Sequence, residues 1–336
     1  MRLRLLSCSE WVPRLARLVL ALGFLAVPLV GWAQLPNIPH VGLLTQDSPQ
    51  DPATRNRLRD AMRDLGYVEG QSLVIDVRWS NGNNERLAGL AAELAALNPA
   101  VIVAETTAAA LAAKHVTATI PIVMVSVSDP VASGLIASLS HSGNNITGVS
   151  DFGIELTAKQ LDLLHAVVPK AKRVAVLMSD NPVHPLQVKA IQDAAKGMGL
   201  TILPTMVRSY EDFEQAFASM AKKKAEALIP LGGAPFGTRR ERDKIVELAL
   251  KAGLPTFYTN RWPVSGGGLL SYGPSTAYKW KQAAQYVDKL LKGAKPDNLP
   301  VQQPTVFELV INLKTAKALA LAIPASVRLL ADEVIQ

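Results

Sequence analysis

The sequence predicts an α/β protein with two lobes, each built on a doubly wound parallel sheet. First, 336 residues are enough for about two domains of roughly 150 residues each. Second, short runs rich in branched apolar residues alternate with longer helical patterns. Such strand–helix–strand units imply right-handed crossovers between parallel strands. Third, eleven candidate strands are more than one open sheet usually holds, which favours two sheets.

The expected strands fall into two series of mostly four to six residues with little polar alternation. This pattern is typical of strands that are buried on both faces. The first series is His40–Leu44, Leu73–Val77, Val101–Ala104, Ile122–Val125 and Ile146–Val149. The second series is Arg173–Met178, Thr201–Leu203, Ala227–Pro230, Pro255–Tyr258, Leu269–Tyr272 and Phe307–Ile311.

The helices between these strands have readable ends. Asp51 and Pro52 predict an N-cap followed by a first-turn proline, and Gly66 follows the last turn of that helix. A second helix opens at Asn84 and Glu85. The other expected helices are Glu155–Val168, Thr238–Ala252 and Thr276–Leu291.

The first 33 residues predict a secretory signal peptide. Four arginines precede the apolar run Leu18–Val30, and the small-residue pattern Gly31-Trp32-Ala33 follows it. The run is shorter than the about 20 residues of a membrane-spanning helix, although an uncleaved anchor is the alternative. Cys8 precedes the run, which does not fit a lipid-anchored cysteine. We therefore expect export and cleavage after Ala33.

Composition excludes several classes of protein. Hydrophobic residues make up 49% and charged residues 19%, which is enough for a large core and too little charge for a disordered chain. Cys8 is the single cysteine, so disulfide scaffolds, iron–sulfur clusters and zinc–cysteine sites are excluded. The formal net charge of +7 includes four arginines of the expected signal peptide. The remaining charge predicts solubility and no nucleic-acid partner.

Catalytic signatures are missing from the sequence. It has no Gly-x-Ser-x-Gly elbow and no P-loop, and its five histidines lack metal-ligand spacing. The nearest dinucleotide motif, Gly232–Gly237, has Ala234 in place of the middle glycine. Its glycines either let a ligand approach the backbone or serve the turn alone. We expect a protein that is not an enzyme and binds no metal and no cofactor.

Polar residues follow the expected strands at their carboxyl ends. Open parallel sheets bind ligands at this edge, where loops and helix N-termini converge. Each such residue is also a possible helix cap, but together they predict a binding cleft. The candidates are Gln46, Thr106, Thr107, Ser126 and Asp129 in the first series and Asn181, Gly232 and Asn260 in the second.

Three segments carry a resemblance to a known family. They are RLRDAMRDLGYVEGQSLVIDVRWSNGNNERL near the N-terminus, SVSDPVASGLIASLSHSGNNITGVSDF from Ser126 to Phe152, and GGLLSYGPSTAYKWKQAAQYVDKLLKGAKPDNLPVQQPTVFELVINLKTAKALALAIP from Gly267 to Pro324. They resemble the substrate-binding proteins of ATP-binding-cassette importers related to the tryptophan/tyrosine-type binding proteins. The resemblance covers nearly the whole chain after the expected signal peptide.

The resemblance implies a type I periplasmic-binding-protein fold, with two lobes joined by three crossings that close on a ligand. We place the crossings near Val149–Phe152, Thr259–Trp262 and Gln302–Thr305. The first lobe then comprises 37–149 and 263–301, and the second 150–262 and 302–336. A periplasmic monomer that delivers a small ligand to a membrane permease is expected. The alternatives are an exported sensing module for a receptor and, less favoured, an exported enzyme.

The resemblance also suggests an amino acid or an aromatic compound as the ligand. Thr106 and Thr107, before a helix near Ala108, are suited to bind a carboxylate. Asp151 is the candidate acceptor for an ammonium group, with capping of the helix at Glu155 as its alternative. Flat walls for an apolar side chain are expected from Phe152, Phe236, Trp262 and Tyr272.

Overall fold

The computed structural model describes residues 38–233 and 235–336, apart from the side chain of Glu155. Met1–Asn37 and Ile38–Gln336 are separate units. The expected signal peptide, residues 1–33, therefore lies outside the described residues, as does Ala234. No helix in the described ranges is long and apolar enough to cross a membrane.

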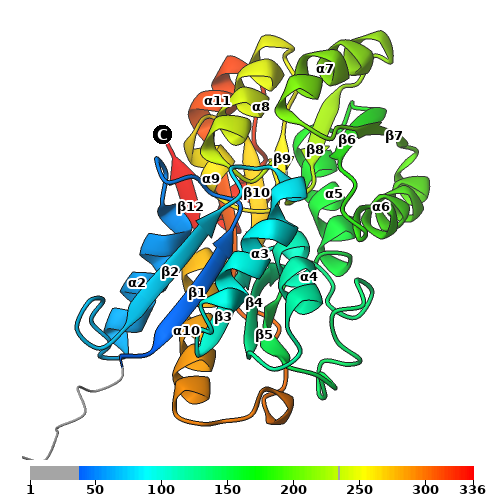
Figure 1. Cartoon of the computed structure of the whole chain (residues 1–336). Coiled ribbons are helices and arrows are strands. Elements are labelled where there is room, and N and C mark those ends of the chain that lie inside the picture. The colour runs from blue at the N-terminus through cyan, green and yellow to red at the C-terminus, as the bar shows by residue number, and fades with distance from the viewer. Residues whose placement is uncertain (1–37, 234) are drawn as a thin grey trace, which may run out of the picture. The chain divides into compact units, whose positions relative to one another are not determined.

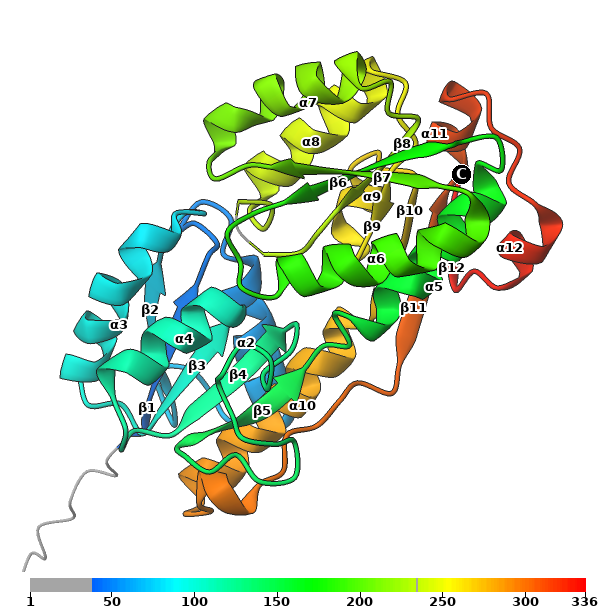
Figure 2. The ribbon, with the colours of Figure 1, turned by 90° about the vertical axis from the view of Figure 1, so that its right-hand side faces the viewer.

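The first lobe is built on a five-stranded parallel sheet with the order β2-β1-β3-β4-β5 (Figures 1 and 2). Its strands are β1 (His40–Thr45), β2 (Val74–Trp79), β3 (Val101–Glu105), β4 (Ile122–Val127) and β5 (Ile146–Ser150). Its helices are α2 (Ala53–Asp64), α3 (Leu87–Ala96), α4 (Thr107–Val116) and α10 (Thr276–Leu291), with a 3-10 turn at Asn84–Arg86.

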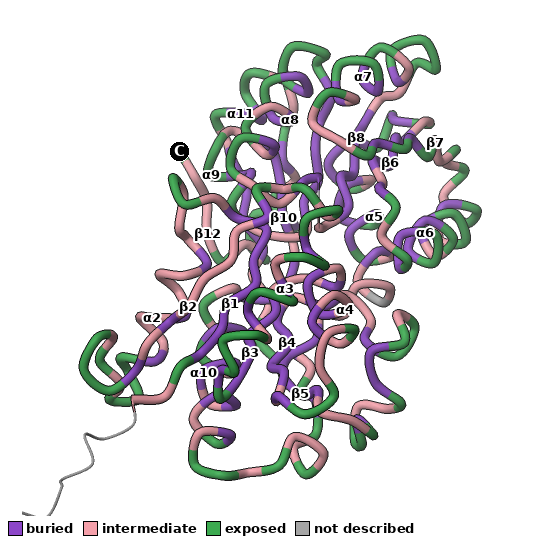
Figure 3. The backbone as a smooth tube through the Cα atoms, viewed as in Figure 1, coloured by how far each residue is buried: buried purple, intermediate pink, exposed green. Residues whose placement is uncertain are grey.

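Successive residues in each strand of the first sheet point to opposite faces of the sheet, as the two-residue period of a strand requires. Val101 and Val103 pack with α2 and α10 on one face. Ile102 and Ala104 pack with α3 and α4 on the other. Because both faces are covered, β1, β3, β4 and β5 are buried along most of their length, as Figure 3 shows, whereas the edge strand β2 is mostly half-buried.

The second lobe contains two strips of strands, β7-β6-β8 and β12-β11-β10-β9. A parallel bridge between Leu228 and Thr256 connects them. The strands are β6 (Arg173–Met178), β7 (Thr201–Met206), β8 (Ala227–Pro230), β9 (Phe257–Tyr258), β10 (Leu270–Pro274), β11 (Phe307–Asn312) and β12 (Glu333–Ile335). The pairing is parallel except between β10 and β11, which are antiparallel.

Helices cover both faces of this second sheet. One core cluster includes residues of α5 (Glu155–Val167), α6 (His184–Met198), α11 (Leu313–Ala318) and α12 (Ala325–Leu329). The opposite cluster includes residues of α7 (Phe213–Lys222), α8 (Arg239–Lys251) and α9 (Trp262–Ser265). Two 3-10 turns lie at Tyr210–Asp212 and Pro296–Asn298. The expected two-lobed, doubly wound α/β class is confirmed.

Strand pairing corrects one of the expected crossings. The chain was expected to return to the first lobe at Thr259–Trp262, but β10 pairs with β9 and β11 and so belongs to the second sheet. The return occurs after β10, where Ser275 caps α10 by accepting a hydrogen bond from the Tyr278 amide. Residues 263–274 therefore lie with the second lobe. The other two crossings stay predictions, because strand pairing locates sheets and not hinges.

One expected helix cap is also wrong. Asp51 was expected to cap α2, but the helix begins at Ala53 without a side-chain bond from the preceding residue. Instead, Asp47 Oδ2 accepts from the Thr54 amide at 2.8 Å. The capping carboxylate thus comes from the end of β1, because the β1–α2 loop folds back over the start of the helix.

Candidate ligand-binding cleft

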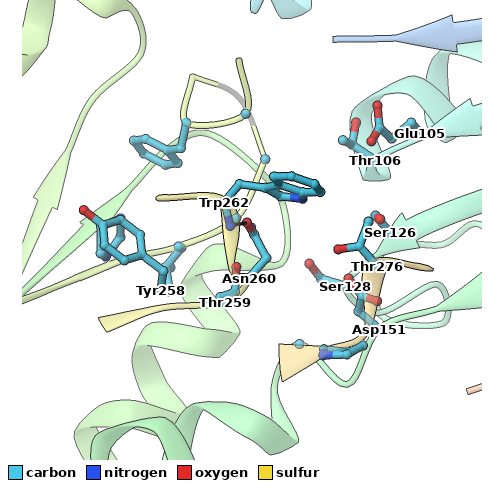
Figure 4. A pocket seen from close by; sticks show the side chains of 18 of the residues that line it. Glu105, Thr106, Ser126, Ser128, Asp151, Tyr258, Thr259, Asn260, Trp262 and Thr276 are labelled. Carbon is cyan, nitrogen blue, oxygen red and sulfur yellow. Dashed lines mark hydrogen bonds between the residues drawn. The ribbon is translucent and has the colours of Figure 1, made fainter. Parts of the chain in front are cut away.

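A cavity of about 170 Å³ lies between the two lobes, which is the scale of a small molecule and not of a polymer. In Figure 4, Trp262 and Asn260 of the second lobe lie on one side of it, and Glu105, Thr106, Ser126 and Ser128 of the first lie on the other. The cavity occupies the edge where the carboxyl ends of the strands meet.

The first-lobe wall follows from the ends of β3 and β4. Thr106 and Thr107 end β3 and begin α4, and the Thr106 side chain accepts from the Ala109 amide. Ser126 and Ser128 lie at the end of β4. Thr106 has φ 84° and Ser126 φ 57°, a region that non-glycine residues rarely adopt. Strain of this kind at two adjacent strand ends is typical of a functional site.

The second-lobe wall comes from the loops after β6, β8 and β9. Asn181, Gly232, Asn260 and Trp262 line the cavity there. The conformational interpretation of the glycine turn finds support at Gly233, and the approach of a ligand to its backbone stays a prediction. Gly233 has φ 94°, a conformational role, whereas Gly237 has no such angle and lies against Gln46 of the other lobe.

Eight of the ten predicted site residues line the cavity, and two do not. Asp129 is a turn residue whose Oδ1 accepts from the Val131 and Ala132 amides. Tyr272 packs its ring on Phe307, with centroids 5.9 Å apart, and is not among the residues that line the cavity. Both follow a strand-end pattern in the sequence, but their local contacts turn them away. Of the expected aromatic walls, Phe152, Phe236 and Trp262 line the cavity.

Asp151 lines the cavity, but its carboxylate is already paired. Lys279 of α10 lies 3.0 Å from Asp151 Oδ1 and also donates to Ser126 Oγ at 3.1 Å. The Lys279 side chain is 7% exposed and that of Asp151 21%. Asp151 makes no cap for α5. The pair joins the loop that follows β5 to the first turn of α10.

Glu105 forms a second buried acidic group at the end of β3. Its Oε2 accepts from the hydroxyls of Thr45 and Thr54 at 2.7 and 2.8 Å. Burial raises the pKa of the Glu105 carboxyl, and the neighbouring Asp47 carboxylate raises it further, against the opposing effects of Arg57 and the two hydroxyls. The folded protein therefore favours the protonated form of Glu105 more than the unfolded chain does.

We expect Glu105→Gln to stabilise the protein at pH 8, by about 1 kcal/mol, since it removes a buried charge and keeps an oxygen for both hydroxyls. Because the raised pKa belongs to the folded state, wild type loses stability as pH rises above the unfolded value of 4.5. The gain of the variant should therefore shrink towards pH 4.5 in urea titrations. The exposed Glu85→Gln is the control, and a gain that does not depend on pH would contradict the assignment.

Among the cleft residues that were not predicted from the sequence are Arg57 and Arg242. Arg57 lies on α2 with its guanidinium carbon 4.5 Å from the Trp262 ring centroid, and Arg242 of α8 donates to the Gly237 carbonyl. Neither follows a strand, so the strand-end pattern gave no signal for them. In a helix rich in charged residues, a basic side chain is normally interpreted as part of the solvent-exposed face.

The cavity wall holds buried polar atoms without a hydrogen-bond partner among the described residues. They are Gln46 Oε1, Asp151 Oδ1, Gln160 Oε1, Gln187 Oε1, Tyr258 Oη and Trp280 Nε1. The amide nitrogens of Gln160 and Gln187 donate to the carbonyls of Tyr272 and Gly153, which fixes their oxygens as acceptors. Buried polar groups are normally paired, so these atoms indicate a place for a polar ligand.

The lobes also meet at a rim, defined here as Gln46 and Gly82 of the first lobe with Gly237 and Glu241 of the second. A Cβ on Gly82 would overlap the Glu241 carboxylate, and one on Gly237 would lie 3.2 Å from Gln46 Oε1. The stacking of Arg57 on Trp262 is a further contact between the lobes. The two walls of the cavity are thus in direct contact along this rim.

Comparison with known proteins identifies a family and a relative that are both described as binding proteins. The sequence model of the family described as ABC transporter substrate binding protein matches residues 45–335. The tyrosine-binding protein of Clostridioides difficile is 27% identical over 281 residues, covering 83% of this chain and 79% of that protein.

Solved structures agree with this match. A conserved domain protein from Vibrio cholerae has a TM-score of 0.82 at 27% identity and covers 88% of this chain and 99% of that chain. An ABC domain in complex with L-Trp from Streptococcus pneumonia has a TM-score of 0.81 at 26% identity, with the same coverage.

Proposed function

We propose, since this chain belongs to the ABC transporter substrate-binding protein family, that it captures a small solute in the cleft between its lobes by hinge closure. The observation that carries the proposal is the cavity between the lobes, lined from both sides by buried polar atoms that have no hydrogen-bond partner among the described residues. A ligand that contacts both walls stabilises the closed arrangement, because only one wall is available when the lobes separate.

The ligand class that fits best is an amino acid or an aromatic compound. The relatives described as tyrosine-binding and as a complex with L-Trp support this class. Phe152, Phe236 and Trp262 offer apolar walls, and hydroxyls and amides lie between them. Trp262 is 39% exposed, which is high for a large aromatic side chain and suits a ring that a ligand covers.

The cellular role that we propose is delivery of this ligand to a membrane permease from the periplasm, as a monomer and after removal of residues 1–33. The family membership supports the permease as partner. Binding without catalysis is proposed because the family is described as substrate-binding and the Clostridioides difficile relative as tyrosine-binding.

The proposal is tested by a thermal-shift screen of the protein that starts at Gln34, followed by small-angle scattering. A ligand at 100 times its dissociation constant should add about 2.7 kcal/mol to stability. Saturation with that ligand should reduce the radius of gyration. An unchanged radius with a tight ligand would count against hinge closure.

A further inference from the structure

Arg57 and Arg242 face the cleft from opposite lobes without an ion-pair partner among the described residues. Both line the cavity and both are half-buried. The groups that they contact are neutral. Arg57 lies over the Trp262 ring and 3.5 Å from the Thr54 hydroxyl, and Arg242 donates to the Gly237 carbonyl. These contacts hold the guanidinium groups in place and leave donors unused.

The carboxylates at this end of the cleft are Asp47 and Glu105, and both are engaged elsewhere. Asp47 is 9% exposed and accepts from the Thr54 amide at the start of α2. Glu105 accepts from two hydroxyls, and its burial favours the protonated form. Burial lowers the pKa of the Arg242 guanidinium, Asp47 raises it, and Arg57 lowers it, while Asp51 and Asp243 raise it from outside the cavity lining. Two guanidinium groups thus line this end of the cavity beside two carboxyl groups, of which Glu105 favours its protonated form and Asp47 accepts from the α2 backbone.

The carboxylate that lines the opposite end of the cleft is that of Asp151, and a lysine of the protein already holds it. Asp151 is paired with Lys279 at 3.0 Å, and a ligand ammonium would have to compete with that buried lysine. The acceptors here without a hydrogen-bond partner among the described residues are the neutral oxygens of Gln160 and Gln187, and Asp151 Oδ1, which lies 3.0 Å from the Lys279 ammonium. The charged recognition in this cleft is thus directed at an anion.

We propose that the ligand carries a carboxylate that binds between Arg57 and Arg242, one guanidinium from each lobe. The inference rests on the proposed function and names the chemistry of its ligand. Guanidinium groups bind carboxylates through paired, charge-assisted hydrogen bonds. Because the two arginines belong to different lobes, the carboxylate bridges them only in the closed arrangement and so favours closure.

The test uses calorimetry with three probes of one shape: L-tyrosine, tyramine without the carboxylate, and 3-(4-hydroxyphenyl)propionate without the ammonium. Tyramine should bind at least tenfold more weakly than L-tyrosine, whereas the propionate should stay within about threefold. Arg57→Gln and Arg242→Gln should each weaken both carboxylates at least tenfold and leave tyramine unchanged. Arg59→Gln on α2 and Arg240→Gln on α8 are the matched controls.

If none of the three probes binds, a thermal-shift panel of amino acids, carboxylic acids, amines and sugars replaces them. The inference requires that the stabilising compounds are carboxylates and that both arginine variants lose the shift. A neutral or purely cationic compound that binds wild type and variants alike would overturn the carboxylate site and leave solute capture standing. A panel without any stabilising compound would overturn both.

Discussion

Asp151→Ala is expected to lower the free energy of unfolding by about 3 kcal/mol, since it leaves the ammonium of Lys279 buried and unpaired. The two side chains are 3.0 Å apart, and that of Lys279 is 7% exposed. Removing one partner of a buried pair costs more than the pair contributes, because the remaining charge keeps its desolvation penalty. Urea titration of the ligand-free protein measures the loss.

A double variant separates this account from a general loss of packing. Asp151→Ala combined with Lys279→Met should recover most of the lost stability, because an apolar side chain replaces the stranded charge. Asp60→Ala, at an exposed pair with Arg59, is the control and should cost less than about 1 kcal/mol. If the double variant were as unstable as Asp151→Ala alone, an unpaired Lys279 would not be the cause.

Much of the fold could be predicted from the sequence, because strands that are buried on both faces are recognisable as short runs of apolar residues. β6 and β8 have the predicted ends, and α10 spans Thr276–Leu291 as expected. β12, at Glu333–Ile335, was not predicted, since three residues give no periodicity and its pairing with β11 is a tertiary contact. The antiparallel pairing of β10 with β11 was not predicted either, because the residue pattern of a buried strand does not show in which direction its neighbour runs.

The candidate site was predicted in part, and its errors have one physical origin. Strand ends converge by topology, so polar residues that follow strands could be assigned to one cleft without knowing their contacts. Arg57, Arg242 and Lys279 lie on helices, where a cation is usually a solvated residue. Lys279 also changes the meaning of Asp151, which was expected to meet a ligand ammonium and instead meets a lysine 128 positions along the chain.

Replacing Gly237 by residues with larger side chains is expected to weaken ligand binding, and the loss should grow with the size of the side chain. Gly237 follows β8 in the second lobe, and its missing Cβ would lie 3.2 Å from Gln46 Oε1 of the first lobe. Gln46 cannot easily withdraw, because its amide nitrogen donates to Asn84 Oδ1 at 2.8 Å. The φ angle of Gly237 is not in the left-handed region, so the backbone at this position tolerates a side chain until the lobes close.

The series Gly237→Ala, Gly237→Val and Gly237→Phe tests closure without touching the charged groups. Alanine requires a shift of a few tenths of an ångström and should change affinity less than about threefold. Valine should weaken binding by about tenfold and phenylalanine by a hundredfold or more, since overpacking of a tight contact costs about 1–3 kcal/mol or more. The same substitutions at Gly89, an exposed position of α3 with open space around it, are the matched control.

Urea titration of the ligand-free Gly237 variants should show stabilities close to wild type, because the obstruction acts only between the lobes. Equal affinity across the Gly237 series would mean that the ligand binds without bringing Gln46 and Gly237 together, and the closed rim would then play no part in capture.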